Sequence, residues 1–464
     1  MLPARRAATL YVLALLLLTA LAFWPGLSGG FLFDDYPNIV QQEEVHADSL
    51  SIESLRTAAD AFNHGPVGRP LATISFAVDH AIWGKHPRGY KLSSLLVHLA
   101  NAFLVFLLVR RLLPLAGGLA GQSVGAAFAV ALIWAVHPLQ VSTVLYVVQR
   151  METLSLTFVL LALLAYLRGR SLQINGARAW PWLSAVVPLV ALGLFAKENA
   201  LLLPAFTLAL ELTVLRFSAA NPDTSRWWRR AYAGAAALAV LAFVLLVVPR
   251  YLPAEVYAIR EFSLQERLLT QLRVLPMYLG WIVLPLPSSY VFYYDNFPLS
   301  TGLLTPITTL LGAVFLMGLA ALAFTLRRKL PLLSLGILWF FASHIITSNV
   351  VPLEIAFEHR NYFAILGVLL ALADLIRRIP LSDVPRIRPL TVGVVITGML
   401  VITLIRSATW GNPLHLAMEL AAENPGSSRA STDLGEQFIG MVRRGARIEV
   451  VETDRGVHAA SFSA

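Results

Sequence analysis

Long apolar runs alternate with short polar segments along most of this chain. The first run, residues 8–24, is long enough to cross a bilayer, because about 20 helical residues span roughly 30 Å of hydrocarbon. Runs of comparable character recur at residues 92–113, 124–136, 151–167, 182–195, 201–215, 231–248, 303–324, 332–346, 363–376 and 390–405. The pattern predicts an all-α polytopic integral membrane protein with about eleven crossings.

One apolar stretch, residues 268–286, interrupts the alternation because Arg273 and several prolines lie within or beside it. We expect it to be re-entrant or interfacial. With that assignment, the basic clusters between the runs, beginning with Arg5 and Arg6, fall on one side of the membrane. Because cytoplasmic loops are rich in Lys and Arg, we expect that side to be the cytoplasm. The first long polar segment, residues 26–89, is expected on the extracytoplasmic side as a loop of short interfacial helices, in a bacterial inner membrane whose outer face meets the periplasm.

The composition changes after residue 405. Apolar positions at helical spacing over residues 410–421 and a second short helix over 430–441 predict a helical hairpin outside the membrane. The chain therefore divides into a transmembrane module, residues 1–405, and an extracytoplasmic helical tail, residues 406–464.

Composition narrows the class of protein. Hydrophobic residues make up 57% of the chain, charged residues 14%, and the mean hydropathy is +0.69, which is typical of a membrane protein. The net charge of +9 lies in short clusters between apolar runs, so nucleic-acid binding has little support. The absence of cysteine excludes disulfides, thiolate metal sites and a cysteine nucleophile. No Walker A, dinucleotide-binding or Gly-x-Ser-x-Gly motif occurs in a suitable context, so ATP is not expected as a substrate.

Two adjacent carboxylates, Asp34 and Asp35, follow the first apolar run at the outer edge of the membrane. A solvated turn is the simpler interpretation, since Asp, Pro and Asn all favour turns. Phe31, Phe33 and Tyr36 flank the pair, however, and partial desolvation would raise the pKa of one carboxyl and suit it to act as a general base. The pair could alternatively bind a divalent cation such as Mg or Mn, with water and phosphate oxygens completing the shell.

Further charged and polar side chains are expected at the same outer edge if the runs alternate. Each could simply pair locally at a helix end, as Arg150 with Glu152 or Lys197 with Glu198. Together they suit transfer from a lipid phosphate to a hydroxyl or amine, in which an Asp accepts the proton and cations neutralise the leaving phosphate. These residues are Arg69, His137, Gln149, Arg150, Glu152, Lys197, Glu198, Glu358, His359 and Arg360.

Several of these motifs resemble one family, the GT-C membrane glycosyltransferases, nearest to the protein O-mannosyltransferase type and its relatives with C-terminal tetratricopeptide repeats. The resemblance covers most of the chain and includes the tail hairpin, although the repeat-bearing members have several hairpins where this chain has at most one. The matching pieces are Phe33-Asp-Asp-Tyr-Pro-Asn-Ile39, Gly68-Arg-Pro-Leu71, His137-Pro-Leu-Gln140, Val148-Gln-Arg150 with Glu152, Ala196-Lys-Glu-Asn199 and Glu358-His-Arg-Asn-Tyr362.

The resemblance implies an inverting transfer of one sugar from a polyprenyl- or dolichyl-phosphate carrier to an acceptor hydroxyl, on a protein or a glycan, at the outer face. It places the base on Asp34 or Asp35, with Asp34 preferred. It also implies that the carrier phosphate is held by Arg150, Arg69, Lys197, His359 and Arg360, with support from His137, Glu152, Glu198 and Glu358.

Two other functions remain open from the sequence. A transporter or flippase of a lipid-linked or envelope precursor would line its path with intramembrane charges, and it predicts inverted repeats and interrupted helices at the midplane. Most charges here instead lie at the ends of runs. The third hypothesis is a non-catalytic assembly platform for envelope polysaccharide that uses the tail hairpin as an interaction surface.

Overall fold

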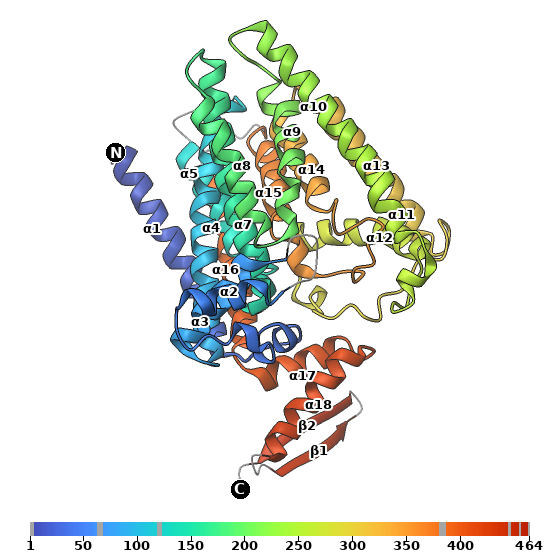
Figure 1. Cartoon of the computed structure of the whole chain (residues 1–464). Helices are drawn as coiled ribbons and strands as arrows, with labels where there is room; N and C mark the ends of the chain where they lie inside the picture. The colour runs from blue at the N-terminus through green and yellow to red at the C-terminus, as the bar shows by residue number, and fades with distance from the viewer. Residues whose placement is uncertain are drawn as a thin grey trace.

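The computed structural model of this chain describes residues 4–62, 68–117, 123–379, 387–443, 447–453 and 456–462. Within these ranges, seven helical segments are long and apolar enough to cross a membrane, and four shorter apolar helices lie among them (Figure 1). The seven contain α1 (Ala4–Phe23), α4 (Pro87–Leu115), α7 (Arg150–Ile174), α9 (Leu203–Leu210), α10 (Pro222–Ala242) continued by α11 (Val248–Tyr251), α13 (Thr308–Leu326) and α16 (Ile387–Trp410).

The four shorter helices are α5 (Ser123–Ala135), α8 (Trp180–Leu194), α14 (Pro331–Ser343) and α15 (Ala364–Ile376). A multi-pass helical membrane protein is therefore confirmed. The count of eleven crossings stays a prediction, because the shorter helices fall below the usual length of a membrane span. Helix α12 (Leu264–Val283) occupies the stretch expected to be re-entrant; it opens with a capping box between Ser263 and Glu266 and lies across the ends of its neighbours in Figure 1.

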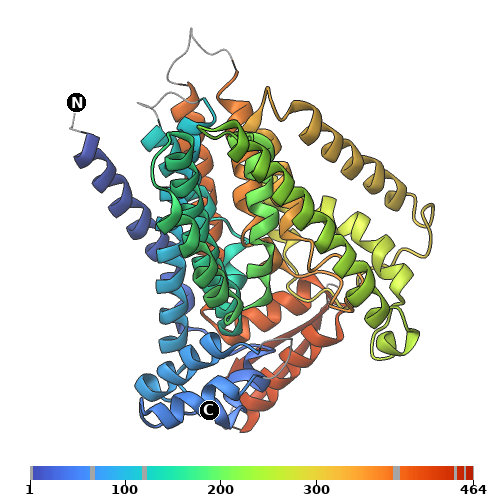
Figure 2. The same ribbon diagram turned by 45° about the horizontal axis from the view of Figure 1, so that its top comes forward.

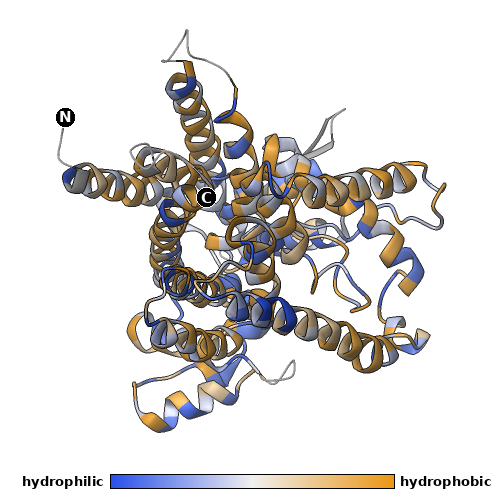
Figure 3. Ribbon diagram, turned by 90° about the horizontal axis from the view of Figure 1, so that it is seen from above, coloured by the Kyte–Doolittle hydropathy of each residue, from blue (hydrophilic) through white to orange (hydrophobic). Residues whose placement is uncertain are grey.

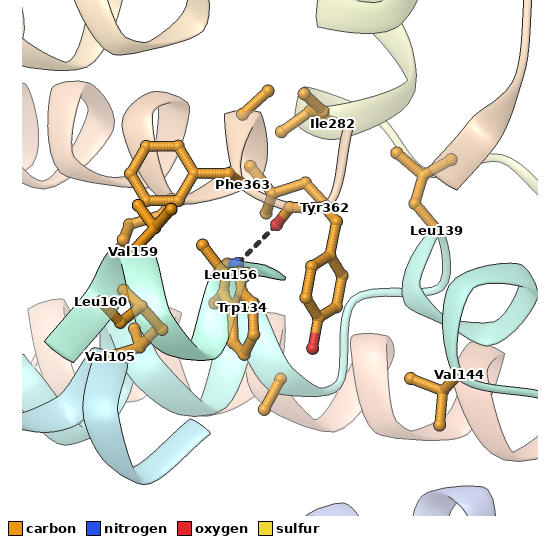
Figure 4. Packing of buried hydrophobic residues seen from close by; sticks show 14 of the residues in the cluster. Val105, Trp134, Leu139, Val144, Leu156, Val159, Leu160, Ile282, Tyr362 and Phe363 are labelled. Carbon is orange, nitrogen blue, oxygen red and sulfur yellow. Dashed lines mark hydrogen bonds between the residues drawn. The ribbon is translucent and has the colours of Figure 1, made fainter. Parts of the chain in front are cut away.

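The core of the bundle is formed mainly by α4, α5, α7, α14 and α15. The indole N–H of Trp134 donates to the carbonyl oxygen of Tyr362 at 3.0 Å, in the centre of the packed side chains of Figure 4. Gly336 and Gly367 let α14 and α15 approach backbone to backbone. Helices at the periphery differ, since α10 has no buried residue, and Figure 3 shows hydrophobic residues along these outer helices. Such a surface is expected where lipid is the solvent.

The basic clusters meet at one end of the bundle. Arg216 donates to the carbonyl oxygen of Arg328 at 3.0 Å, and Arg378 donates to that of Lys329 at 2.9 Å. Arg377 reaches the carbonyl oxygen of Ala116 at the end of α4. The opposite end carries the first long polar segment and the tail (Figure 2).

The first long polar segment, residues 26–89, consists of short helices in its described part, as expected. Between α1 and α4 the described residues form only brief elements, which bring polar side chains to the end of the bundle. They are η1 (Trp24–Ser28), the π-helical turn η2 (Tyr36–Val40), η3 (Glu43–Val45), α2 (Ile52–Asp60) and α3 (Pro70–Trp83).

The tail forms the predicted helical hairpin, from α17 (Pro413–Glu423) and α18 (Ser428–Arg443). Helix α16 runs without a break through residue 405, where the sequence suggested a boundary. Two antiparallel strands, β1 (Arg447–Thr453) and β2 (Gly456–Phe462), follow the hairpin with Arg447 opposite Phe462. The expectation of a purely helical tail is therefore wrong for these residues, because it rested on helical spacing in the two preceding segments.

Candidate active site

The Asp-Asp loop has a constrained backbone. Phe33 lies in the left-handed region with φ 43°, which is unfavourable for an aromatic residue and persists only where surrounding contacts impose it. Its ring packs edge-on against Tyr293, with centroids 5.4 Å apart, and the guanidinium of Arg429 lies 5.1 Å from the ring centroid. The next residue, Asp34, donates its N–H to the hydroxyl of Tyr146 at 3.0 Å. These contacts fix where the Asp34 carboxyl points.

Asp35 anchors the loop. It is fully buried, and its two carboxyl oxygens accept the N–H groups of Val148 at 2.7 Å and Leu32 at 3.0 Å. Burial raises the pKa of Asp35 to about 7, against the lowering effect of these two donors and of the nearby Lys91. With both oxygens occupied by backbone donors, Asp35 holds the loop to the turn before α7.

Asp34 is the freer carboxyl of the pair. It is only partly buried, and its side chain accepts a hydrogen bond from the Tyr146 hydroxyl. Burial raises the pKa of Asp34; the Tyr146 hydrogen bond and the charges of Arg429 and Lys197 lower it, and the charge of Glu354 raises it. A carboxyl with a raised pKa, held in place and facing cations, has the properties of a general base.

Two ion pairs of the candidate site connect segments that are distant in sequence, and Lys197 of one pair interacts with Asp34. Lys197 pairs with Glu152 on α7 at 3.0 Å, and Glu152 also accepts both bonds from the Asn199 amide, at 2.8 and 2.7 Å. Arg69, just before α3, binds both oxygens of Glu198 at 3.0 Å. The local pairs suggested by the sequence, Arg150 with Glu152 and Lys197 with Glu198, are therefore wrong, because helix packing offers each charge a partner from another element.

His359 and Arg360 lie in the turn η11 (Glu358–Asn361) before α15. His359 is buried and stacks on Phe357 at 4.9 Å; burial, together with the charges of Lys197, Arg360 and Arg69, lowers its pKa well below the usual value. A neutral imidazole is therefore expected there.

Arg360 differs from Lys197 and Arg69, which both pair with a carboxylate. Its side chain is 8% exposed and donates to the carbonyl oxygen of Ile355 at 3.2 Å, yet no carboxylate of the described residues lies within 4.0 Å. It borders a small cavity of about 20 Å³ that Glu152 and Asn199 also line. A buried cation without a carboxylate is costly unless an anion binds there.

Three of the residues expected in the site are held in structural contacts. Every nitrogen of the Arg150 guanidinium bonds to the protein: it pairs with Asp79 at 2.5 Å and donates to the carbonyl oxygen of Tyr90 at 2.6 Å, to Ser94 and to Ser75. It thereby joins α3, α4 and α7, and the structure does not present it as a free phosphate ligand.

The other two are equally satisfied. His137 donates from Nε2 to the carbonyl oxygen of Ile282 at 3.0 Å and accepts the Leu139 N–H at Nδ1; burial lowers its pKa to about 4. Glu358 binds Arg406 with both oxygens, at 2.8 and 2.7 Å. These side chains stabilise the bundle beneath the site.

Sequence reasoning missed Tyr146, Glu354 and Arg429, which surround Asp34 from a turn, a loop and the tail. Only one weak signal was available, the polar and aromatic stretch at residues 293–296 that binds the tail.

A divalent cation does not fit the Asp-Asp pair. Both oxygens of Asp35 accept backbone N–H groups, which leaves Asp34 as the remaining carboxylate ligand of the pair. Across the described ranges, no three or more His, Cys, Asp or Glu side chains gather as a metal site would require.

Fold and site together describe a multi-pass helical membrane protein with a cluster of acid, basic and hydroxyl groups at the end of the bundle opposite its arginine-rich loops. The chain is similar to protein O-mannosyl-transferases Tmtc1 and Tmtc2 of Drosophila melanogaster, at 32% identity over 181 and 183 residues, or 38% of this chain in each case. It is also 28% identical to mouse protein O-mannosyl-transferase TMTC3 over 189 residues.

The resemblance to protein O-mannosyltransferases is thereby confirmed over 38–39% of the chain, a smaller share than the motifs suggested. The chain spans 19% of the length of each of these three relatives. No model of a known protein family matches the chain, and no solved structure does.

Proposed function

We propose that this protein is an inverting glycosyltransferase that moves a sugar from a polyprenyl-phosphate carrier to an acceptor hydroxyl of a protein or glycan. The observation that carries this proposal is the position of Asp34, a held carboxyl with a raised pKa that interacts electrostatically with Lys197 and Arg429. The names of the relatives support the same class of reaction.

The proposed step follows from these groups. The acceptor oxygen attacks the anomeric carbon as its proton passes to the Asp34 carboxylate, the bond from that carbon to the carrier phosphate breaks, and the configuration inverts. The phosphate leaves with the electron pair of the broken bond. Lys197, Arg69 and Arg360 stabilise the added charge, because a cation in a poorly hydrated site interacts strongly with a phosphate. Neutral His359 donates a hydrogen bond to the same group.

Arg360 is the strongest candidate for direct contact with the phosphate. Lys197 and Arg69 already have carboxylate partners, whereas the described residues offer Arg360 none within 4.0 Å. Phosphate binding therefore satisfies Arg360 without breaking an ion pair.

The proposed orientation places the site on the extracytoplasmic face. The arginine-rich ends of α4, α13 and α15 gather at the opposite end of the bundle, and Lys and Arg concentrate in cytoplasmic loops. The proposal keeps eleven crossings, with α12 at the interface and the isoprenoid chain of the donor in the bilayer beside the bundle.

Asp34→Asn tests the proposal. The purified protein in proteoliposomes is given mannosyl-phosphoryl-polyprenol and a threonine-rich peptide, and both mannosyl peptide and released polyprenyl phosphate are measured. Loss of a general base predicts a decrease of about 10²- to 10⁴-fold in both products. Glu43→Gln removes an exposed carboxyl from the same outer segment and should leave the rate unchanged.

Transfer by Asp34→Asn at the wild-type rate would refute the assignment of the base. Movement of the lipid-linked sugar across the bilayer by the wild-type protein, with no transfer to peptide or glycan, would overturn the proposal in favour of a flippase.

A further inference from the structure

The C-terminal hairpin is fixed to the membrane domain beside the Asp-Asp loop by a specific set of hydrogen bonds. Asp295 accepts the hydroxyls of Ser427 at 2.7 Å and Ser428 at 3.1 Å, together with the N–H of Arg429 at 3.3 Å. A carboxylate at the first turn of a helix also interacts favourably with the helix dipole. This contact sets the position of the first turn of α18.

Further hydrogen bonds connect the loop at residues 293–296 to the hairpin on both sides of Asp295. The amides of Asn296 and Asn424 bond to each other at 2.7 and 2.9 Å, and Asn424 also donates to the carbonyl oxygen of Tyr293 at 3.1 Å. The Tyr293 hydroxyl donates to Asp433, about one turn beyond Arg429 on α18. Tyr293 is the residue whose ring packs on Phe33, so the tail and the Asp-Asp loop share a partner.

These hydrogen bonds place the side chain of Arg429 next to the Asp-Asp loop. Its guanidinium lies 5.1 Å from the centroid of the Phe33 ring, and its Nη2 pairs with Glu354 at 3.0 Å. Arg260 pairs with the same Glu354 oxygen at 2.7 Å. Arg429 therefore stands between a loop carboxylate and the residue that precedes Asp34.

We propose that Arg429, from the C-terminal tail, is a positioning residue for Asp34. Arg429 contacts the ring of Phe33, which helps to hold the Phe33 backbone in the left-handed region, and it neutralises the charge of Glu354. The tail therefore contributes a side chain to the site formed by the membrane domain. The inference rests on the proposed function, since it assigns Arg429 a role in the same reaction.

Electrostatics supports this geometry. The groups that interact with Asp34 are Tyr146 from the turn before α7, Lys197 just before the 3-10 helix η6 (Glu198–Leu202), Tyr293 and Glu354 from loops, and Arg429 from α18. Removing Arg429 takes away a positive charge and leaves Glu354 less compensated, and both changes raise the pKa of Asp34. A base with a higher pKa becomes active only at higher pH.

Arg429→Gln in the full chain tests the inference by the mannosyl transfer assay with the same donor and peptide. We expect kcat to fall about 10-fold, KM for the donor to change less than about 2-fold, and the acidic limb of the kcat profile to move to higher pH. Arg429→Lys keeps the charge and should restore the position of the limb. Arg443→Gln, at the exposed end of α18, is the matched control and should behave as wild type.

The double variant Arg429→Gln/Glu354→Gln separates charge from folding. Removing the carboxylate as well should move the limb back toward lower pH, even if the hairpin packs less tightly. An unchanged profile in Arg429→Gln, or a loss of activity that follows thermal stability with no movement of the limb, would overturn the inference. If Asp34→Asn is inactive and Arg429→Gln is normal, only this inference fails; if the wild-type protein transfers no sugar to peptide or glycan, the proposed function itself fails.

Discussion

The contact between α14 and α15 gives a sharp test of the packing, because one substitution should have opposite effects at two glycines. In Gly336→Ala, the new Cβ would lie 2.1 Å from the carbonyl oxygen of Gly367 and 2.8 Å from the Cβ of Ala371. Ordinary contacts begin near 3.4 Å, so the two helices must separate by roughly 1 Å. In Gly318→Ala on α13, the new Cβ would meet nothing within 4 Å.

The magnitudes follow from two terms. Overpacking costs about 1–3 kcal/mol, and replacing a helical glycine by alanine returns up to about 1 kcal/mol of helix propensity. The backbone clash is larger than the propensity gain at Gly336, so we expect a net loss of about 1–2 kcal/mol there. At Gly318 only the propensity gain remains, so we expect a change between zero and about 1 kcal/mol in favour of folding.

Equilibrium unfolding in mixed detergent and SDS micelles measures both variants. The turn with His359 and Arg360 leads directly into α15, so Gly336→Ala should also reduce mannosyl transfer, whereas Gly318→Ala should not. Equal stability of the two variants would refute the close approach of α14 and α15, and with it the placement of Arg360.

Two further predictions concern charge. Because burial raises the pKa of Asp34 and the proposed base must be ionised, mannosyl transfer should increase with pH through a limb above the ordinary carboxyl pKa of 3.8; kcat measured against pH should show this limb for the wild type and lose it in Asp34→Asn. Glu358→Gln should lower the free energy of unfolding by about 3–5 kcal/mol in the same assay, because Arg406 is left buried without its carboxylate. Asp223→Asn is the control: it breaks the pair with Arg226, whose two side chains are 67% and 75% exposed, and should change that free energy by less than about 0.5 kcal/mol. A small effect of Glu358→Gln would contradict the assignment of that residue to structural support.

Sequence patterns predicted the helices well, because hydropathy and spacing are properties of consecutive residues. Each apolar run overlaps a helix between α1 and α16, and the spacing of apolar residues after position 405 predicted the hairpin of α17 and α18. The sequence also singled out the stretch that contains Asp34 and Asp35, since two carboxylates among aromatic residues at a membrane edge are unusual.

Neighbouring residues in sequence were a poor guide to charge pairing at the candidate site. Arg150 pairs with Asp79 and Lys197 with Glu152, so these two cations have partners on other elements. In a medium of low dielectric constant, the partner is decided by which elements pack together, and a one-dimensional pattern does not contain that information.

The sequence by itself determined a chain of membrane helices with an acidic pair beyond the first of them, because burying apolar runs in lipid is a local requirement. Only the tertiary structure decided that Asp35 anchors the loop while Asp34 keeps a partly exposed carboxyl, and that Arg429 returns from the far end of the chain to interact with it. The physical reason is that hydrogen-bond donors and charges act through space over a few ångströms, so their roles are fixed only once distant segments have packed.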